Sequence, residues 1–334
     1  MIRSTYMLFA LAALAVSLGA TGCSGSSANA QGGNKLTLVA YSTPREVYEE
    51  LTKEFAQTGP GKGVSFDESY GSSGEQSRAV EAGLQADVVA FSLEPDMKRL
   101  VDADLVDGNW ASAEHKGMIS NSVVVFAVRK GNPKAIKNWD DLTKDGVEVI
   151  TPNPFTSGGA RWNVMAAYGA QRELGKSHDE AVAYLEELFK HVSVQDKSAR
   201  ESLQTFTGGK GDVLLAYENE AITAQQKGES LDYVIPDQTI LIENPIAVTK
   251  DAGSQAAAFV DFLRTEQAQK VFAEKGYRSV LPSLVDASVY PKPKTLFTIQ
   301  DFGGWGTVKD EFFDPENGIV AKIEMSLGVS TDSG

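Results

Sequence analysis

The sequence predicts an α/β protein of two lobes, each a mixed sheet flanked by helices, with the ligand bound in the cleft between them. β-Branched runs alternate with segments of helical spacing along most of its 334 residues, which is typical of a sheet covered on both faces. Roughly 300 residues follow the N-terminal segment, and a chain of that length usually forms two domains. Long apolar runs at 121–128 and 240–248 suit strands that cross between lobes. The predicted lobes are 35–128 together with 240–334, and 129–239.

Residues 1–23 have the features of a lipoprotein signal peptide. Arg3 is positively charged, and the apolar stretch at 7–18 is too short to span a membrane. The four residues that end at Cys23 resemble a lipobox, so we expect Cys23 to become the lipidated N-terminus outside the cytoplasm. An ordinary signal peptide with an incidental cysteine is the alternative. Residues 24–34 are small and polar and are expected to form a flexible tether.

The formal net charge is −14, which argues against nucleic acid and against anionic lipid surfaces as partners. Membrane contact is therefore expected only through the N-terminal lipid. The same charge is compatible with an anion ligand if local dipoles, and not the net charge, hold that ligand. Because Cys23 is the single cysteine, no disulfide is expected.

Strands and helices follow one another in order along the chain. Strands are expected at 36–41, 64–68 and 87–91, and helices at 44–57, from Ser73 onward and at 255–275. Thr43 with Glu46, and Ser73 with Gln76, have the spacing of capping boxes at the first two helix starts. The loops at Ser42 and Ser73 therefore each connect a strand to a helix N-terminus.

The most informative stretch is TPNPFTSGGARWN, residues 151–163. It follows a β-branched run at 147–150 and precedes a segment of helical spacing, so a helix is expected to begin at Ser157-Gly158-Gly159. The first N–H groups of a helix lack backbone partners and carry partial positive charge. Glycines let an oxyanion approach that backbone closely. The stretch thus predicts an anion site built without a formal charge.

Tyr217 ends a further predicted strand at 212–216. Ligands of open α/β sheets lie beyond the carboxyl ends of strands. The loops at Ser42, Ser73, Ser157 and Tyr217 all have that position and fall on both predicted lobes. We therefore expect them to meet at one cleft, which closes about a hinge.

Several blocks of the sequence resemble the sulfate-binding proteins that serve ABC importers. The blocks are LVAYSTPREVYEE, SYGSSGEQ, VRKGNPKAIKNWDDL, TPNPFTSGGARWN, DVLLAYENEA and LFTIQDFGGW. The resemblance implies a type II periplasmic-binding-protein fold and delivery of sulfate to the transmembrane subunits of a permease, by a monomer without a cofactor. It also implies that Ser73, Ser157, Gly158, Gly159 and the backbone N–H of Ala199 contact the anion.

Two positions depart from the resemblance and leave the identity of the anion open. Tyr217 stands where the family usually has Trp, and Ser42 stands where it commonly has Asp. Both residues are similar to those of molybdate and tungstate binders, and thiosulfate is a further alternative. Packing in the core is the other interpretation of Tyr217. The intact signature loop favours sulfate, which carries no proton at neutral pH and suits a site made only of donors.

An extracytoplasmic ester hydrolase is the competing class of function. It needs a metal cluster or an activated nucleophile. The three histidines lack metal-ligand spacing, and no G-x-S-x-G motif is present. We therefore expect no catalytic residue and no metal site. Arg45, Arg161 and Arg200 are expected to support loops against nearby carboxylates and not to bind the anion.

Overall fold

The computed structural model describes residues 35–331, so the predictions for the signal peptide, for Cys23 and for the tether lie outside the described residues. The strands are β1 Lys35–Tyr41, β2 Ser65–Gly71, β3 Val88–Ala90, β4 Met118–Arg129, β5 Val149–Ile150, β6 Val192–Val194, β7 Val213–Tyr217, β8 Leu231–Val234, β9 Gln238–Val248 and β10 Thr295–Phe297. The α-helices are α1 Arg45–Phe55, α2 Ser73–Glu81, α3 Glu94–Asp102, α4 Gly158–Glu173, α5 His178–Lys190, α6 Ala199–Thr207, α7 Glu218–Gln226, α8 Ser254–Leu263, α9 Glu266–Glu274, α10 Gly304–Phe313 and α11 Ile319–Ser326.

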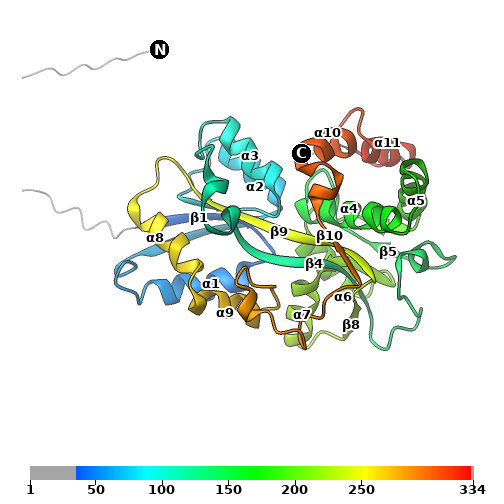
Figure 1. Ribbon diagram of the computed structural model, residues 1–334, viewed down its shortest axis with the longest axis horizontal. Helices are drawn as coiled ribbons and strands as arrows, with labels where there is room; N and C mark the ends of the chain where they lie inside the picture. Colours follow the sequence, from blue (N-terminus) through cyan, green and yellow to red (C-terminus); the bar gives the residue numbers. More distant parts are fainter. Residues whose placement is uncertain (1–34, 332–334) are drawn as a thin grey trace, which may run out of the picture. The chain divides into compact units, whose positions relative to one another are not determined.

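The strands form a mixed sheet in the order β2-β1-β3-β9-β4-β7-β5-β6, with β10 beside β9 and β8 beside β4. The three strands β1, β2 and β3 are parallel, as are β5, β6 and β7. The antiparallel pairs all involve β4 or β9, the two long strands that run across the middle of the sheet (Figure 1). The α/β class with a mixed sheet is thus confirmed.

The strand β4 changes its partner part-way along its length. Val123 lies opposite Leu241 of β9, whereas Val124 lies opposite Tyr217 of β7. The apolar runs predicted at 121–128 and 240–248 are therefore β4 and β9, which join the two parallel portions of the sheet. The boundaries of the lobes themselves stay a prediction.

Helices cover both faces of the sheet, as the apolar character of consecutive strand residues requires. In β1, Leu38 packs with α1, α8 and α9, while its neighbour Val39 packs on the opposite face with α3. In β4, Phe126 packs with α4 and α5, while Val125 packs with α6 and α7. Two apolar clusters on opposite faces therefore support each parallel portion.

The C-terminal part of the chain divides between these clusters. The helices α8 and α9 belong to the cluster of α1, whereas α10 and α11 belong to the cluster of α4 and α5. The ring of Trp305 in α10 meets the ring of Trp162 in α4 edge-on, with centroids 4.7 Å apart. No helix between residues 35 and 331 combines the length and apolar character that a membrane crossing requires.

Three predicted features of the helices are wrong. The helix predicted at 255–275 is two helices, because Thr265 caps α9 by accepting from the N–H of Ala268 (3.3 Å). The capping box of Thr43 does not form, since Pro44 is the N-cap of α1 and the Thr43 hydroxyl donates to Glu220 (3.5 Å). The capping box of Ser73 does not form either, because the N-cap of α2 is the preceding serine.

Candidate functional site

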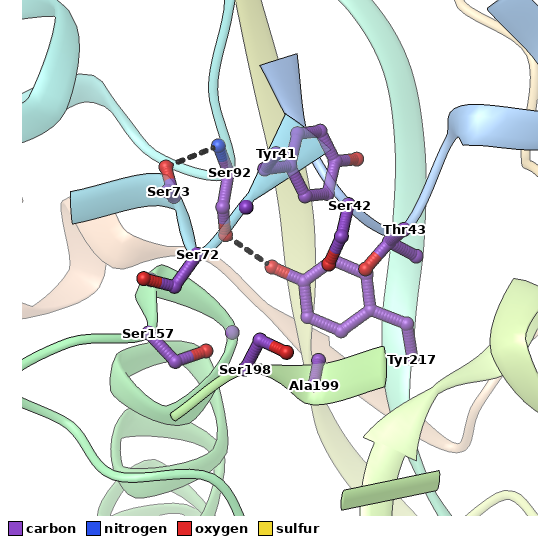
Figure 2. A pocket seen from close by; sticks show the side chains of 13 residues that line it. Tyr41, Ser42, Thr43, Ser72, Ser73, Ser92, Ser157, Ser198, Ala199 and Tyr217 are labelled. Carbon is purple, nitrogen blue, oxygen red and sulfur yellow. Dashed lines mark hydrogen bonds between the residues drawn. The ribbon is translucent and has the colours of Figure 1, made fainter. Parts of the chain in front are cut away.

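The loops that the sequence predicted to bind a ligand together line one small pocket (Figure 2). Its cavity volume is ≈ 10 Å³, far below the 300–1,000 Å³ of sites for drug-sized ligands, so it has room for only a few atoms. Its lining consists of Tyr41, Ser42, Thr43, Gly71, Ser72, Ser73, Ser92, Ser157, Gly158, Gly159, Ser198, Ala199 and Tyr217. All seven residues predicted to bind the anion are among them, and none of the thirteen carries a formal charge.

Four helices begin at this pocket: α2, α4, α6 and α7. Their N-caps are Ser72, Ser157, Ser198 and Tyr217. Each helix follows a strand end or a loop beyond it, so its axis starts where the sheet stops. The first N–H groups of these helices have no intrahelical acceptor, and the aligned peptide dipoles place partial positive charge at their starts. The pocket is therefore electropositive without a charged side chain.

Two of the serine caps keep a proton available for a ligand. The Ser157 Oγ accepts from the N–H of Ala160 (3.4 Å), and the Ser198 Oγ accepts from the N–H of Glu201 (3.2 Å). A hydroxyl that accepts from its own helix still has its single O–H to donate. Both serines can thus add a side-chain donor to the N–H groups beside them.

Ser73 differs, because its hydroxyl is occupied behind the pocket. The Ser73 Oγ donates to the Asp96 carboxylate (2.6 Å) and accepts from the N–H of Ser92 (2.9 Å). Burial raises the pKa of Asp96, while the charge of Arg161 and the Ser73 hydrogen bond act in the opposite direction. Ser73 can therefore offer a ligand its backbone N–H but not its hydroxyl proton.

The neighbouring Ser72 has a free hydroxyl for a ligand, whereas the hydroxyl proton of Ser73 is already donated to Asp96. Ser72 is 3% exposed, and its Oγ has no hydrogen-bond partner. A buried hydroxyl without a partner is costly, so it points to a ligand that completes the site.

Tyr217 is buried at the end of β7, and its hydroxyl lies 2.6 Å from the Ser92 Oγ. Burial raises the pKa of Tyr217 well above that of an ordinary phenol, so the ring is uncharged at neutral pH. The N–H of Tyr217 donates to Glu220 (3.3 Å), whose pKa is raised to about 7 by burial. Tyr217 thus both lines the pocket and packs in the core, which unites the two interpretations from the sequence.

The two glycines of the signature loop have different surroundings. A Cβ on Gly158 would lie 2.8 Å from Ser92 and from the side chain of Leu93, so this glycine is needed for packing against them. A Cβ on Gly159 would make ordinary contacts of 3.4–3.6 Å with Ser157, Ala199 and Tyr217. Because all three of these neighbours line the pocket, it is Gly159 whose missing side chain leaves room for a ligand.

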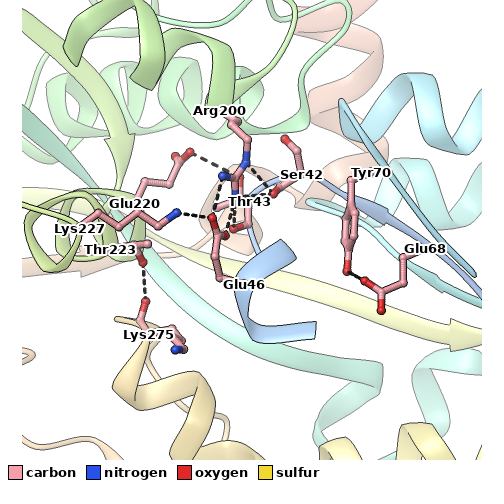
Figure 3. Close-up of polar contacts among 10 residues, drawn as sticks. All are labelled: Ser42, Thr43, Glu46, Glu68, Tyr70, Arg200, Glu220, Thr223, Lys227 and Lys275. Atoms are coloured by element: carbon pink, nitrogen blue, oxygen red, sulfur yellow. Dashed lines mark hydrogen bonds and ion pairs between the residues drawn. The ribbon is translucent and has the colours of Figure 1, made fainter. Parts of the chain in front are cut away.

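Arg200 supports the loop at Ser42 from outside the pocket (Figure 3). Its guanidinium donates to the carbonyl oxygen of Ser42 (2.9 Å) and to both carboxylate oxygens of Glu46 (2.6 and 2.8 Å). Burial would raise the pKa of Glu46, but hydrogen bonds from Arg200 and Lys227 outweigh it and lower that pKa to about 2. These bonds therefore tie the start of α6 to the start of α1 and to the loop before it.

The other two arginines also serve packing. The Arg161 Nε donates to the carbonyl oxygen of Pro154 (2.8 Å), and Arg45 lies over the ring of Tyr70. Within residues 35–331, no three His, Cys, Asp or Glu side chains are grouped so as to hold a metal ion.

Six residues that line the pocket were not predicted to bind the anion: Tyr41, Thr43, Gly71, Ser72, Ser92 and Ser198. Ser72 and Ser198 precede predicted contacts by one residue, so placing the helix caps correctly would have found them. Ser92 follows the strand predicted at 87–91, and the rule that ligands lie beyond strand ends applies to it equally.

Comparison with known proteins assigns the chain to a family. Residues 36–278 match the family model described as bacterial extracellular solute-binding protein. A sulfate-binding protein of Synechococcus elongatus is 42% identical, over 97% of this chain and 97% of its own length. A thiosulfate-binding protein of Pseudomonas aeruginosa is 34% identical, over 82% of this chain and 88% of its own length.

A solved structure also shows the likeness to a sulfate-binding protein. The sulfate-binding protein SubI from Mycobacterium tuberculosis is 43% identical and superposes with a TM-score of 0.82, covering 84% of this chain and 100% of its own. The resemblance predicted from the sequence blocks is thus confirmed.

Proposed function

We propose that this chain, which belongs to the bacterial extracellular solute-binding proteins, binds sulfate and delivers it to an ABC importer. The predicted fold, the two-lobed type II fold of periplasmic binding proteins, is confirmed by the likeness to a solved member. Membership of this family confirms the predicted location outside the cytoplasm. The members of the family are binding proteins and not enzymes.

The observation that carries the proposal is a small pocket at which four helices begin and which no charged side chain lines. Such a site stabilises an anion through dipoles and hydrogen bonds alone. Sulfate accepts hydrogen bonds on every oxygen and has no proton at neutral pH, so it can use each of these donors. The relatives named for sulfate support this choice of anion.

We assign the contacts as follows. The backbone N–H groups of Ser73, Gly158, Gly159 and Ala199 donate to the anion from the starts of α2, α4 and α6. Hydroxyl donors come from Ser42, Ser72, Ser157 and Tyr217. Each such bond to a charged group is worth about 1.5–3 kcal/mol, so several of them offset the cost of ordering the site and give sub-micromolar affinity.

We further propose that the two lobes are 35–128 with 240–334, and 129–239, and that they close on the anion. Contacts between residues from the two portions support closure, including Arg200 with Ser42 and Ser92 with Tyr217. Small-angle scattering should show a smaller radius of gyration at saturating sulfate. An unchanged radius would contradict closure.

The remaining assignments concern the membrane. We propose that the protein is a monomer, anchored through lipid on Cys23, and that it docks on the transmembrane subunits of the permease. Cys23→Ala should release the protein from membranes that are washed with carbonate. Retention of this variant on washed membranes would contradict the anchor.

Thiosulfate is the second candidate ligand, since a relative 34% identical to this chain is named for it. Molybdate and tungstate remain alternatives because of Ser42 and Tyr217. Calorimetric titration of the purified protein with sulfate, thiosulfate, molybdate, tungstate and phosphate tests the proposal. We expect the tightest binding for sulfate. Tighter binding of another anion would overturn the assignment of the ligand, and absence of binding to all five would overturn the site.

A further inference from the structure

Glu46 of α1 is held at once by two cations from distant elements (Figure 3). The Arg200 guanidinium of α6 donates to both carboxylate oxygens of Glu46, at 2.6 and 2.8 Å, and the Lys227 ammonium after α7 donates to one of them. Glu46 belongs to the proposed lobe 35–128 with 240–334, and both cations belong to the proposed lobe 129–239. The three side chains therefore connect the two lobes, and we call them the Glu46 bridge.

The geometry makes the Glu46 bridge stronger than an ordinary surface ion pair. Exposed pairs contribute little, because water and salt screen them. Only 22% of the Glu46 side chain and 26% of the Arg200 side chain are exposed, and two N–H groups of the guanidinium meet the two oxygens, which is the strong form of a charge-assisted hydrogen bond. Because the pKa of Glu46 is lowered to about 2, the carboxylate stays ionised and the bridge stays intact at neutral pH.

The Glu46 bridge can act on the anion only through the position of the pocket walls. None of its three side chains lines the pocket. Arg200 follows Ala199, whose N–H is one of the proposed contacts, and its guanidinium also donates to the carbonyl oxygen of Ser42 (2.9 Å). Since Ala199 and Ser42 both line the pocket, the bridge holds the start of α6 and the loop at Ser42 together around it.

An anion enclosed between two lobes leaves when the lobes separate, and separation breaks the hydrogen bonds of Glu46. The apparent affinity of a site that exists only in the closed form scales with the fraction of closed protein. We propose that Glu46 is a positioning residue which, through Arg200 and Lys227, holds the two lobes closed over sulfate and slows its release. This inference rests on the proposed function, because it assumes that sulfate binds between lobes that close.

The rate of sulfate release tests the inference. Purified protein loaded with radioactive sulfate is mixed with excess unlabelled sulfate, so that the loss of bound label gives the dissociation rate, and calorimetry gives the affinity. Glu46→Gln keeps the length of the side chain and removes its charge. We expect this variant to release sulfate on the order of 10-fold faster and to bind it on the order of 10-fold more weakly, with the association rate of the parent, because charge-assisted hydrogen bonds are weakened.

Lys227→Met is a milder variant that leaves the bonds from Arg200 in place. Half of the Lys227 side chain is exposed, so its loss should disturb the fold little. We expect release to become roughly 3-fold faster, because an exposed cation contributes less than the bidentate pair.

Glu50→Gln is the matched control on the same helix. Glu50 lies one turn beyond Glu46 in α1 and pairs with Lys275 at the end of α9 (2.8 Å), so this ion pair lies within one proposed lobe. The release rate and the affinity of Glu50→Gln should stay within about twofold of the parent values, since exposed pairs contribute little.

Parental release and affinity in Glu46→Gln would overturn the inference and leave the proposed function standing. An effect confined to the association rate, or an equal acceleration of release in Glu50→Gln, would overturn it as well. If Glu46→Gln does not fold, Lys227→Met decides, and a parental release rate in that variant overturns the inference. A parent that does not bind sulfate overturns both the inference and the proposed function.

Discussion

The N-termini of α2 and α4 reach the same pocket through Ser/Gly loops, yet their serines are used differently. In α4, Ser157 is the N-cap, and its hydroxyl accepts from its own helix and keeps its proton for a ligand. In α2, the Ser73 hydroxyl donates backward to the buried Asp96, and Ser72 takes the cap position with an unpartnered oxygen. The carboxyl group of Asp96 accepts from the serine of one loop, and no carboxyl group is bonded to Ser157 in the other. This difference decides which serine faces the anion.

The largest effect should come from the glycines of α4. A methyl group on Gly159 would stand among Ser157, Ala199 and Tyr217 without a clash, so Gly159→Ala should fold normally and occupy the space of the anion. We expect its affinity for sulfate to fall by at least about 2–3 kcal/mol, since more than one donor loses its contact. Calorimetry measures the affinity, and thermal unfolding checks the fold.

Gly158→Ala is the companion variant. Its Cβ would lie 2.8 Å from Ser92 and Leu93, so the neighbours must move apart, which typically costs about 1–3 kcal/mol. This variant should therefore lose thermal stability as well as affinity. Parent-like affinity in Gly159→Ala would show that the start of α4 does not contact the anion.

The next effect separates the two serines that the sequence presented as equivalent. Ser157→Ala removes a donor and should weaken sulfate binding by about 1.5–3 kcal/mol with a small change in stability. Ser73→Ala leaves Asp96 without its hydrogen bond, so it should lower the free energy of unfolding by about 1–3 kcal/mol and affect affinity less. Chemical denaturation and calorimetry on both variants make the comparison. The reverse pattern would mean that Ser73, not Ser157, donates its hydroxyl.

These serines also show how far the sequence can predict the site. The strand–helix alternation placed both loops correctly, because hydrophobic periodicity and glycine positions are local properties. It could not place the hydroxyl of Ser73, because Asp96 comes 23 residues later and approaches only in the folded chain. The same holds for Ser92, whose partner Tyr217 is 125 residues away. The split of the helix at 255–275 was missed because Thr265 alone marks the break.

Ser72→Ala should have smaller effects: it should raise the stability of the free protein and lower the affinity for sulfate. Its Oγ is buried and unpartnered, so removing it relieves a polar group that the free protein leaves unsatisfied. The free energy of unfolding without ligand should rise by about 1 kcal/mol. The affinity for sulfate should fall by about 1 kcal/mol or more because a donor is lost. Unchanged affinity would remove Ser72 from the proposed contacts and leave α2 with its backbone N–H alone.

The smallest effect concerns the carboxylate behind α2 and appears as pH dependence. Burial raises the pKa of Asp96 in the folded state, so protonation of Asp96 favours folding. Its contribution to stability is present below about pH 3.9, the ordinary value for Asp, and is lost as the pH rises through the folded pKa. Asp96→Asn removes this dependence, so the parent should lose stability relative to the variant as the pH rises above about 3.9.

Asp141 provides a control of opposite sign. Burial would raise the pKa of Asp141, but hydrogen bonds from Lys144 and from the N–H groups of Lys137 and Asn138 lower it. A lowered pKa contributes stability above about pH 3.9 that is lost as the pH falls through the folded value. In denaturation series across pH, Asp141→Asn should therefore have a lower free energy of unfolding than the parent at neutral pH. This difference should become smaller as the pH falls. If Asp96→Asn shows that same trend, Asp96 is held as a charged acceptor for Ser73, and the contrast between α2 and α4 rests on an ion rather than on a neutral carboxyl group.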